Sequence, residues 1–211
     1  MNWAERAQAA IERYDSGEAR DLDQRQLTQL GNAAWAAGLC LLMDGRREES
    51  AEWLRRAAER YRESWEAGAP ADSWGRPIAA MKSLLLAGDD ASAAAHWALD
   101  AGAADAESPI GRYAGTLALL VLGRDHDALH LAGTLRERDD FPHDVADALA
   151  ELAADENRVE YAVAVEQILD SFETRTDFLE DVPVADTVLI VQALAEPRGL
   201  AIDLPASPLL P

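Results

Sequence analysis

The chain of 211 residues has few of the sequence features that are typical of secreted or membrane-spanning proteins. Its one cysteine, Cys40, cannot form a disulfide within the chain, so a reducing compartment fits. The longest apolar run, from Leu117 to Leu122, is far shorter than the ~18 residues of a membrane-spanning helix. The N-terminal residues lack a basic segment followed by an apolar one, the pattern of a secretion signal. These absences predict a soluble cytoplasmic protein in which Cys40 is a small buried hydrophobe.

Positive charge is also scarce. Lys82 is the single lysine beside 18 arginines, and 39 acidic residues give a net charge of -20. Residues 83–211 carry -18 of this charge, with seven basic and 25 acidic side chains. The excess of acid argues against nucleic acid or an anionic membrane as a direct partner. Two explanations stay open: a basic protein partner steered by the acidic half, or a halophilic surface adapted to a salty cytoplasm.

What the chain has in abundance is the composition of an all-α protein. Alanine makes up about a fifth of it, and the β-branched and aromatic residues that favour strands are sparse. Gly45, Gly88 and Gly123 each end an apolar helical run and precede a polar segment that opens another. Glycine is common just past a helix end because it reaches the left-handed conformation without steric cost. The recurrence, at intervals of 43 and 35 residues, predicts helical hairpins; a fourth junction at 153–156 lacks the glycine.

Apolar residues at helical spacing, caps and proline stops predict about ten helices. We expect an all-α fold of the α-solenoid type, a tetratricopeptide-like right-handed stack of helical hairpins. Residues 1–202 are predicted to form a single helical-repeat domain, and 203–211 an extended, proline-containing tail. The expected helices are Trp3–Tyr14 (capped by Asn2), Leu22–Met43, Glu48–Ala67, Gly75–Ala87, Ala91–Ala101 (capped by Asp90), Ser108–Leu122 (with Ser108 as its cap), Asp125–Arg138, Asp144–Ala154, Arg158–Thr174 and one between Pro183 and Pro197.

One short motif invites a metal-site interpretation. His126 and His130 lie four residues apart and share a helix face, with His143 as the only later histidine. The apolar stripe of the same helix, Ala128, Leu131, Ala132 and Leu135, would turn both histidines towards solvent. We therefore expect a solvated polar face there. The sequence has no phosphate loop, nucleophile elbow or paired-cysteine motif, so we predict no catalytic residue, no cofactor and no metal.

Tryptophan is confined to the first 97 residues. Trp35 and Trp65 fall on apolar stripes and are expected in the core. Trp53 lies beside a stripe position and Trp74 lies in a predicted loop before Arg76. Because tryptophan and arginine are enriched at binding hot spots, Trp53, Trp74 and Arg76 are the candidate protein-binding surface.

Three segments carry a resemblance to a known family: Leu-Leu-Leu-Ala-Gly-Asp-Asp at 84–90, Leu-Leu-Val-Leu-Gly-Arg-Asp at 119–125 and Ala-Leu-Ala-x-x-Arg-Gly-Leu-Ala-Ile-Asp-Leu at 193–204. With the closing Ser-Pro-Leu-Leu-Pro, they resemble the immunity-protein-49 family of polymorphic toxin systems over about residues 75–211. The resemblance implies an all-α helical-repeat fold and neutralisation of a toxin by binding it. It supplies no functional residue for this chain.

The sequence thus favours a non-enzymatic protein that binds another protein, with basic proteins as the partners its charge suits. One alternative is a general tetratricopeptide-like scaffold or regulatory adaptor that holds a peptide in a concave groove. A second alternative is a helical metal-dependent enzyme that uses His126, His130 and nearby carboxylates.

Overall fold

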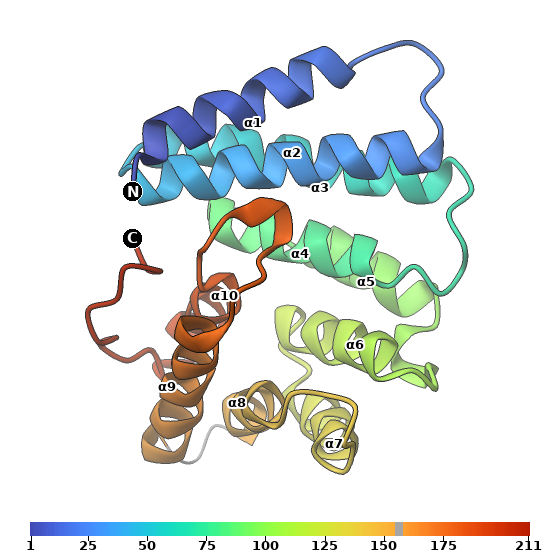
Figure 1. Ribbon diagram of the computed structural model, residues 1–211. Coiled ribbons are helices and arrows are strands. Elements are labelled where there is room, and N and C mark those ends of the chain that lie inside the picture. Colours follow the sequence, from blue (N-terminus) through green and yellow to red (C-terminus); the bar gives the residue numbers. More distant parts are fainter. Residues whose placement is uncertain (155–157) are drawn as a thin grey trace. The chain divides into compact units, whose positions relative to one another are not determined.

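The computed structural model describes residues 1–154 and 158–211, and its regular elements there are all helical (Figure 1). Ten α-helices and three short 3-10 helices occur in these ranges, which confirms the all-α prediction. The chain packs as two compact units. Unit 1 comprises Met1–Asp90, Thr176–Val184 and Pro208–Pro211, and unit 2 comprises Ala91–Arg175 and Ala185–Ser207. The single domain over 1–202 and the right-handed stack stay predictions.

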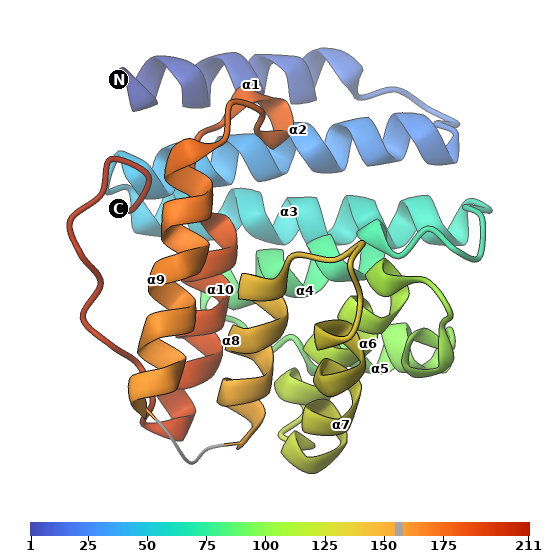
Figure 2. The same ribbon diagram turned by 60° about the horizontal axis from the view of Figure 1, so that its bottom comes forward.

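Unit 1 is built from four helices, each packed against the next in the chain (Figures 1 and 2). They are α1 (Trp3–Gly17), α2 (Gln24–Met43), α3 (Arg47–Glu66) and α4 (Gly75–Ala87). The sequence of α2 is apolar on most sides, and it lies between α1 and α3. Gly38 lets α3 come close, since a Cβ there would lie 2.7 Å from Cγ of Leu54. The Ser50 hydroxyl donates a hydrogen bond of 2.7 Å to the Gly38 carbonyl across the same contact.

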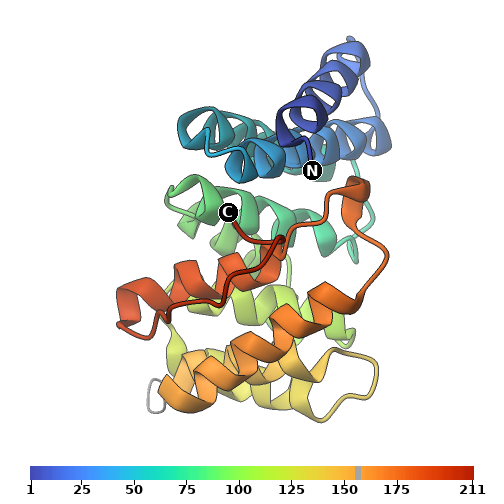
Figure 3. The same cartoon turned by 60° about the vertical axis from the view of Figure 1, so that its left-hand side comes forward.

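Unit 2 contains the other six helices, of which the consecutive ones from α5 to α9 pack in series and α10 contacts α8 and α9 (Figure 3). They are α5 (Ser92–Asp100), α6 (Pro109–Val121), α7 (Asp125–Arg136), α8 (His143–Ala154), α9 (Arg158–Thr174) and α10 (Asp186–Ala195). A 3-10 turn, η1 (Ala103–Asp105), packs on α6, and η3 (Glu196–Arg198) follows α10. The remaining 3-10 turn, η2 (Leu179–Asp181), precedes α10 in the sequence but belongs to unit 1, where it contacts α2. The core of unit 2 is built from fully buried side chains such as Leu117, Leu120, Leu149, Tyr161 and Ile168.

The predicted caps and closing glycines lie at helix ends with one exception. Some bounds differ from the prediction: α1 ends at Gly17 instead of Tyr14, α2 begins at Gln24 instead of Leu22, and α7 ends at Arg136 instead of Arg138. Asn2 and Ser108 cap α1 and α6 through their side chains, and Gly45, Gly88 and Gly123 have φ of 79, 75 and 66°. Asp90 does not occupy the predicted cap position of α5, because that helix begins at Ser92 and its N-cap is Ala91. The predicted junction at 153–156 lies partly outside the described residues. Residues 203–211 form no helix, and no described helix is long and apolar enough to cross a membrane.

Arg198 joins two of the segments on which the family resemblance rests. Its guanidinium donates to the Leu120 carbonyl at 2.7 Å, near the end of α6, and to the Leu194 carbonyl at 2.7 Å in α10. It also pairs with the Asp125 carboxylate at the start of α7, at 2.5 Å. These segments therefore meet in unit 2 through contacts that hold three helix ends together.

Cys40 is completely buried in α2, and burial raises the pKa of its thiol to about 11. The thiolate is the form that attacks a disulfide reagent, so we expect native protein at about pH 8 to resist an aromatic disulfide reagent. In denaturant one thiol per chain should react at once. Rapid stoichiometric labelling of the native protein, measured by absorbance, would show that Cys40 is accessible.

Candidate functional site

The two tryptophans predicted to lie at a binding surface are buried in unit 1. Trp53 in α3 is 8% exposed; its ring meets Tyr14 edge-on at 5.2 Å and the Arg56 guanidinium stacks over it at 4.4 Å. Trp74, at the start of α4, is 7% exposed and lies 6.3 Å from the ring of Trp65. The expectation of accessible rings is therefore wrong. It assumed that one narrow stripe of α3 was covered, whereas Tyr14 of α1 covers a further part of this helix.

Arg76 serves as a link inside unit 1. Its Nε donates to the Ser64 hydroxyl of α3 at 2.7 Å, and its Nη2 donates to the Gln24 side-chain oxygen of α2. Ser64 is fully buried and donates to the Gln24 carbonyl at 2.5 Å. Burial lowers the pKa of Arg76. Arg76 and Trp74 thus meet the C-terminal half of α3, separate from Trp53 in its N-terminal half, and a binding role for the three residues stays untested.

Replacing Arg76 by leucine should lower the free energy of unfolding by about 1–3 kcal/mol, because the buried Ser64 and the half-buried Gln24 each lose a hydrogen-bond donor. Arg25→Leu, at an exposed position of α2, is the matched control and should change stability by about 0.5 kcal/mol or less. Urea unfolding followed by circular dichroism gives both values. Equal effects of the two substitutions would contradict the linking role of Arg76.

His126 and His130 are exposed on α7, as predicted, while Ala128, Leu131, Ala132 and Leu135 of the same helix are buried. His143 is exposed at the start of α8. Among the residues that the structure describes, no group of three or more histidine, cysteine or acidic side chains is placed to hold a metal ion.

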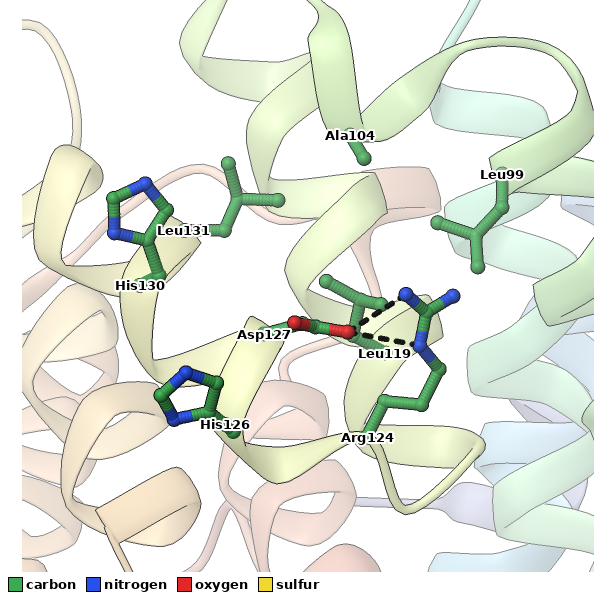
Figure 4. A pocket seen from close by; sticks show the side chains of 8 residues that line it. All are labelled: Leu99, Ala104, Leu119, Arg124, His126, Asp127, His130 and Leu131. Carbon is green, nitrogen blue, oxygen red and sulfur yellow. Dashed lines mark hydrogen bonds and ion pairs between the residues drawn. The ribbon is translucent and has the colours of Figure 1, made fainter.

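A hollow of about 460 Å³ lies beside the two histidines in unit 2 (Figure 4). Leucine side chains and Ala104 give it an apolar part, and the paired Arg124 and Asp127 line it as well, with Nη2 2.7 Å from Oδ2. This lining suits an apolar group that ends in a hydrogen-bonding atom. The sequence did not reveal the hollow, because its lining comes from α5, η1, α6 and α7 with the residue that precedes α7. The lining residues are Leu99, Ala104, Leu119, Arg124, His126, Asp127, His130 and Leu131.

The most pronounced feature of unit 2 is its unneutralised acid. It holds 20 acidic and seven basic side chains. All seven arginines have acceptors inside the unit: Arg124, Arg136, Arg138 and Arg198 pair with carboxylates, and Arg112, Arg158 and Arg175 bind backbone or hydroxyl oxygens. Within the described part of unit 2, nine exposed carboxylates form neither an ion pair nor a side-chain hydrogen bond: Asp100, Asp105, Glu107, Glu137, Asp139, Glu166, Asp170, Glu196 and Asp203.

Unit 1 has a smaller excess of acidic over basic side chains than unit 2. It holds 19 acidic and 12 basic side chains. Arg55 pairs with Asp89 at 2.6 Å and Arg13 pairs with Glu180 at 3.1 Å. The hydrogen bond from Arg55 holds the pKa of Asp89 below its usual value. Two acids of the strongly negative segment 83–211 are thus already neutralised in unit 1.

Comparisons of the chain with protein-family models, with curated proteins and with solved structures found no match. The resemblance to the immunity-protein-49 family therefore stays a prediction. The acidic surface of unit 2, defined as the nine carboxylates named above, is the candidate functional site.

Proposed function

We propose that this chain is a non-enzymatic cytoplasmic protein that binds a basic protein through the acidic surface of unit 2. The resemblance to the immunity-protein-49 family suggests that the partner is a toxin, neutralised by being bound. The observation that supports the proposal is the set of nine exposed carboxylates without ion pairs or side-chain hydrogen bonds, in a unit whose seven arginines all have acceptors within it.

An unpaired surface carboxylate offers a basic partner more negative charge than a carboxylate that is already paired. A carboxylate already paired with arginine has its charge neutralised and some of its acceptor sites occupied, whereas an unpaired one offers its full charge and gives up only water. Many such groups on one unit add their fields over about 8–10 Å at physiological salt, which raises the association rate with a basic protein. The negative charge therefore mainly raises the association rate and the specificity for basic partners, and contacts between individual residues supply the remaining affinity.

The proposal is tested with two variants in which carboxylates become amides. One neutralises the nine carboxylates of the acidic surface. The control neutralises six exposed carboxylates of unit 1: Asp15, Asp21, Glu48, Glu52, Glu59 and Asp72.

The immobilised proteins are exposed to lysate of the cells that make the chain, and captured proteins are identified by mass spectrometry. We expect wild type and control to retain a basic protein, and the acidic-surface variant to bind it at least about tenfold more weakly. Capture of a protein that is not basic, or equal binding by all three, would contradict the proposal.

The hollow beside α7 favours a second candidate, a scaffold or adaptor that receives one side chain of a bound peptide. In that case His130→Ala and Arg124→Ala, which change the lining, should weaken capture more than neutralising the acidic surface does. The two candidates therefore predict opposite rankings of the variants in the same assay.

A further inference from the structure

Helix α9 carries a line of exposed residues along its outer side. Val159, Val163, Glu166, Asp170 and Glu173 follow one another at intervals of four, three, four and three residues, and all are exposed. Val159 is 72% exposed and Val163 is 50% exposed, which is unusual for valine. We call these five residues the α9 stripe; its first part is apolar and the rest is acidic.

The opposite side of α9 fixes the helix in unit 2. Tyr161, Val165, Ile168, Leu169 and Phe172 are all buried. The Tyr161 hydroxyl donates to the Gln192 side-chain oxygen of α10 at 3.1 Å. The α9 stripe is therefore presented on a helix held in place (orange in Figure 3), and a partner would not have to order it first.

The spacing of the α9 stripe is that of the contact seam between two helices. Alternating steps of three and four residues keep side chains on one line of a helix that packs along a partner helix. Two exposed valines offer apolar area to such a partner, and Glu166 and Asp170, both members of the acidic surface, offer unpaired charge. A matching helix needs apolar residues at one end of its seam and arginine or lysine at the other.

We infer that the α9 stripe is the docking surface for a helix of the basic partner, with apolar side chains over Val159 and Val163 and basic side chains over Glu166 and Asp170. The inference rests on the proposed function and names the part of unit 2 that makes local contacts. A second copy of this chain is a poor occupant. Parallel α9 helices would set acid against acid, and antiparallel ones would set valine against acid.

The test uses full-length protein and synthetic helical peptides as probes. The fitted peptides carry leucines at one end of a heptad seam and arginines at the other, in both orders along the chain because the direction of docking is open. A scrambled peptide of the same composition has no seam. Fluorescence anisotropy measures the binding of each, and we expect one fitted peptide to bind about tenfold tighter than the scrambled one.

Three variants locate the contact. Val159→Ser with Val163→Ser, and Glu166→Lys with Asp170→Lys, should each weaken the fitted peptide about tenfold or more. Asp100→Lys with Glu107→Lys makes the same charge change away from α9 and should weaken it only about twofold. A peptide with glutamates in place of its arginines should recover binding to the Glu166→Lys, Asp170→Lys protein.

The results distinguish docking at the α9 stripe from binding through net charge alone and from contact between two copies of the chain. Equal losses from the two lysine pairs would overturn the α9 stripe but leave the proposed function, because binding would then follow net charge alone. Equal binding of fitted and scrambled peptides would also overturn the stripe. A change of molecular mass on Val159→Ser, Val163→Ser, measured by light scattering, would identify the stripe as a contact between copies and overturn the inference.

Discussion

Replacing Gly115 by alanine should lower the free energy of unfolding by about 2 kcal/mol, although alanine favours helices over glycine by nearly 1 kcal/mol. Gly115 lies in α6, and a Cβ there would lie 2.9 Å from both the Cα and the N of Ala104 and 2.9 Å from Leu131 Cδ2. A backbone cannot turn aside as a side chain can, so α6 and η1 must separate.

Gly133→Ala is the matched control for this experiment, since Gly133 is also helical but a Cβ would meet nothing within 4 Å. The same substitution there should stabilise the protein by about 0.5–1 kcal/mol. Urea unfolding of both variants should thus give changes of opposite sign. A stabilising Gly115→Ala would mean that η1 does not approach α6 closely.

Replacing Arg198 by methionine should cost about 2–4 kcal/mol, because the substitution removes donors from two carbonyls and leaves the Asp125 carboxylate without its cation. The side chain of Arg198 is only 10% exposed, so water replaces it poorly. Lysine at this position keeps the charge but cannot present the same fork of donors, so it should restore only part of the loss.

The control for Arg198 is Arg124→Met. Arg124 also pairs with an aspartate of α7, but its side chain is 54% exposed, and exposed pairs contribute about 1 kcal/mol or less. Chemical denaturation of both variants measures the difference. Similar losses would show that the links from Arg198 to α6 and α10 contribute little.

Local signals predicted most of the fold. The spacing of apolar residues placed the helices, and Asn2, Ser108 and the glycine after each apolar run marked their ends, because these signals act within a few residues. The outward position of His126 and His130 followed from the buried stripe of their own helix. Asp90 shows the limit of such signals, since a residue suited to capping does not occupy the N-cap position where the helix starts further on.

Contacts between distant segments could not be predicted. The burial of Trp53 depends on Tyr14, and the role of Arg76 depends on Gln24, which is 52 residues away. The sequence overstates the number of free acidic groups in residues 83–211, because it does not reveal that Asp89 and Glu180 form ion pairs with arginines of unit 1. The unpaired carboxylates of unit 2 can be identified only when the ion pairs of the structure are known.

A halophilic surface remains the competing explanation of the acid, and salt separates the two. Adaptation to a salty cytoplasm predicts a melting temperature that keeps rising between about 0.3 M and molar salt, beyond the range in which screening of surface charges changes much. A surface kept acidic for a basic partner predicts a modest rise that levels off by about 0.3 M salt, where screening of surface charges is nearly complete.

The acidic surface of unit 2 is proposed to attract a basic protein. The most direct test is the association rate constant with the captured partner, measured by stopped-flow fluorescence between about 50 and 300 mM salt. We predict a fall of about tenfold or more for the wild type and a nearly flat response for the variant with the nine carboxylates neutralised. A wild-type rate that does not change with salt would contradict the claim.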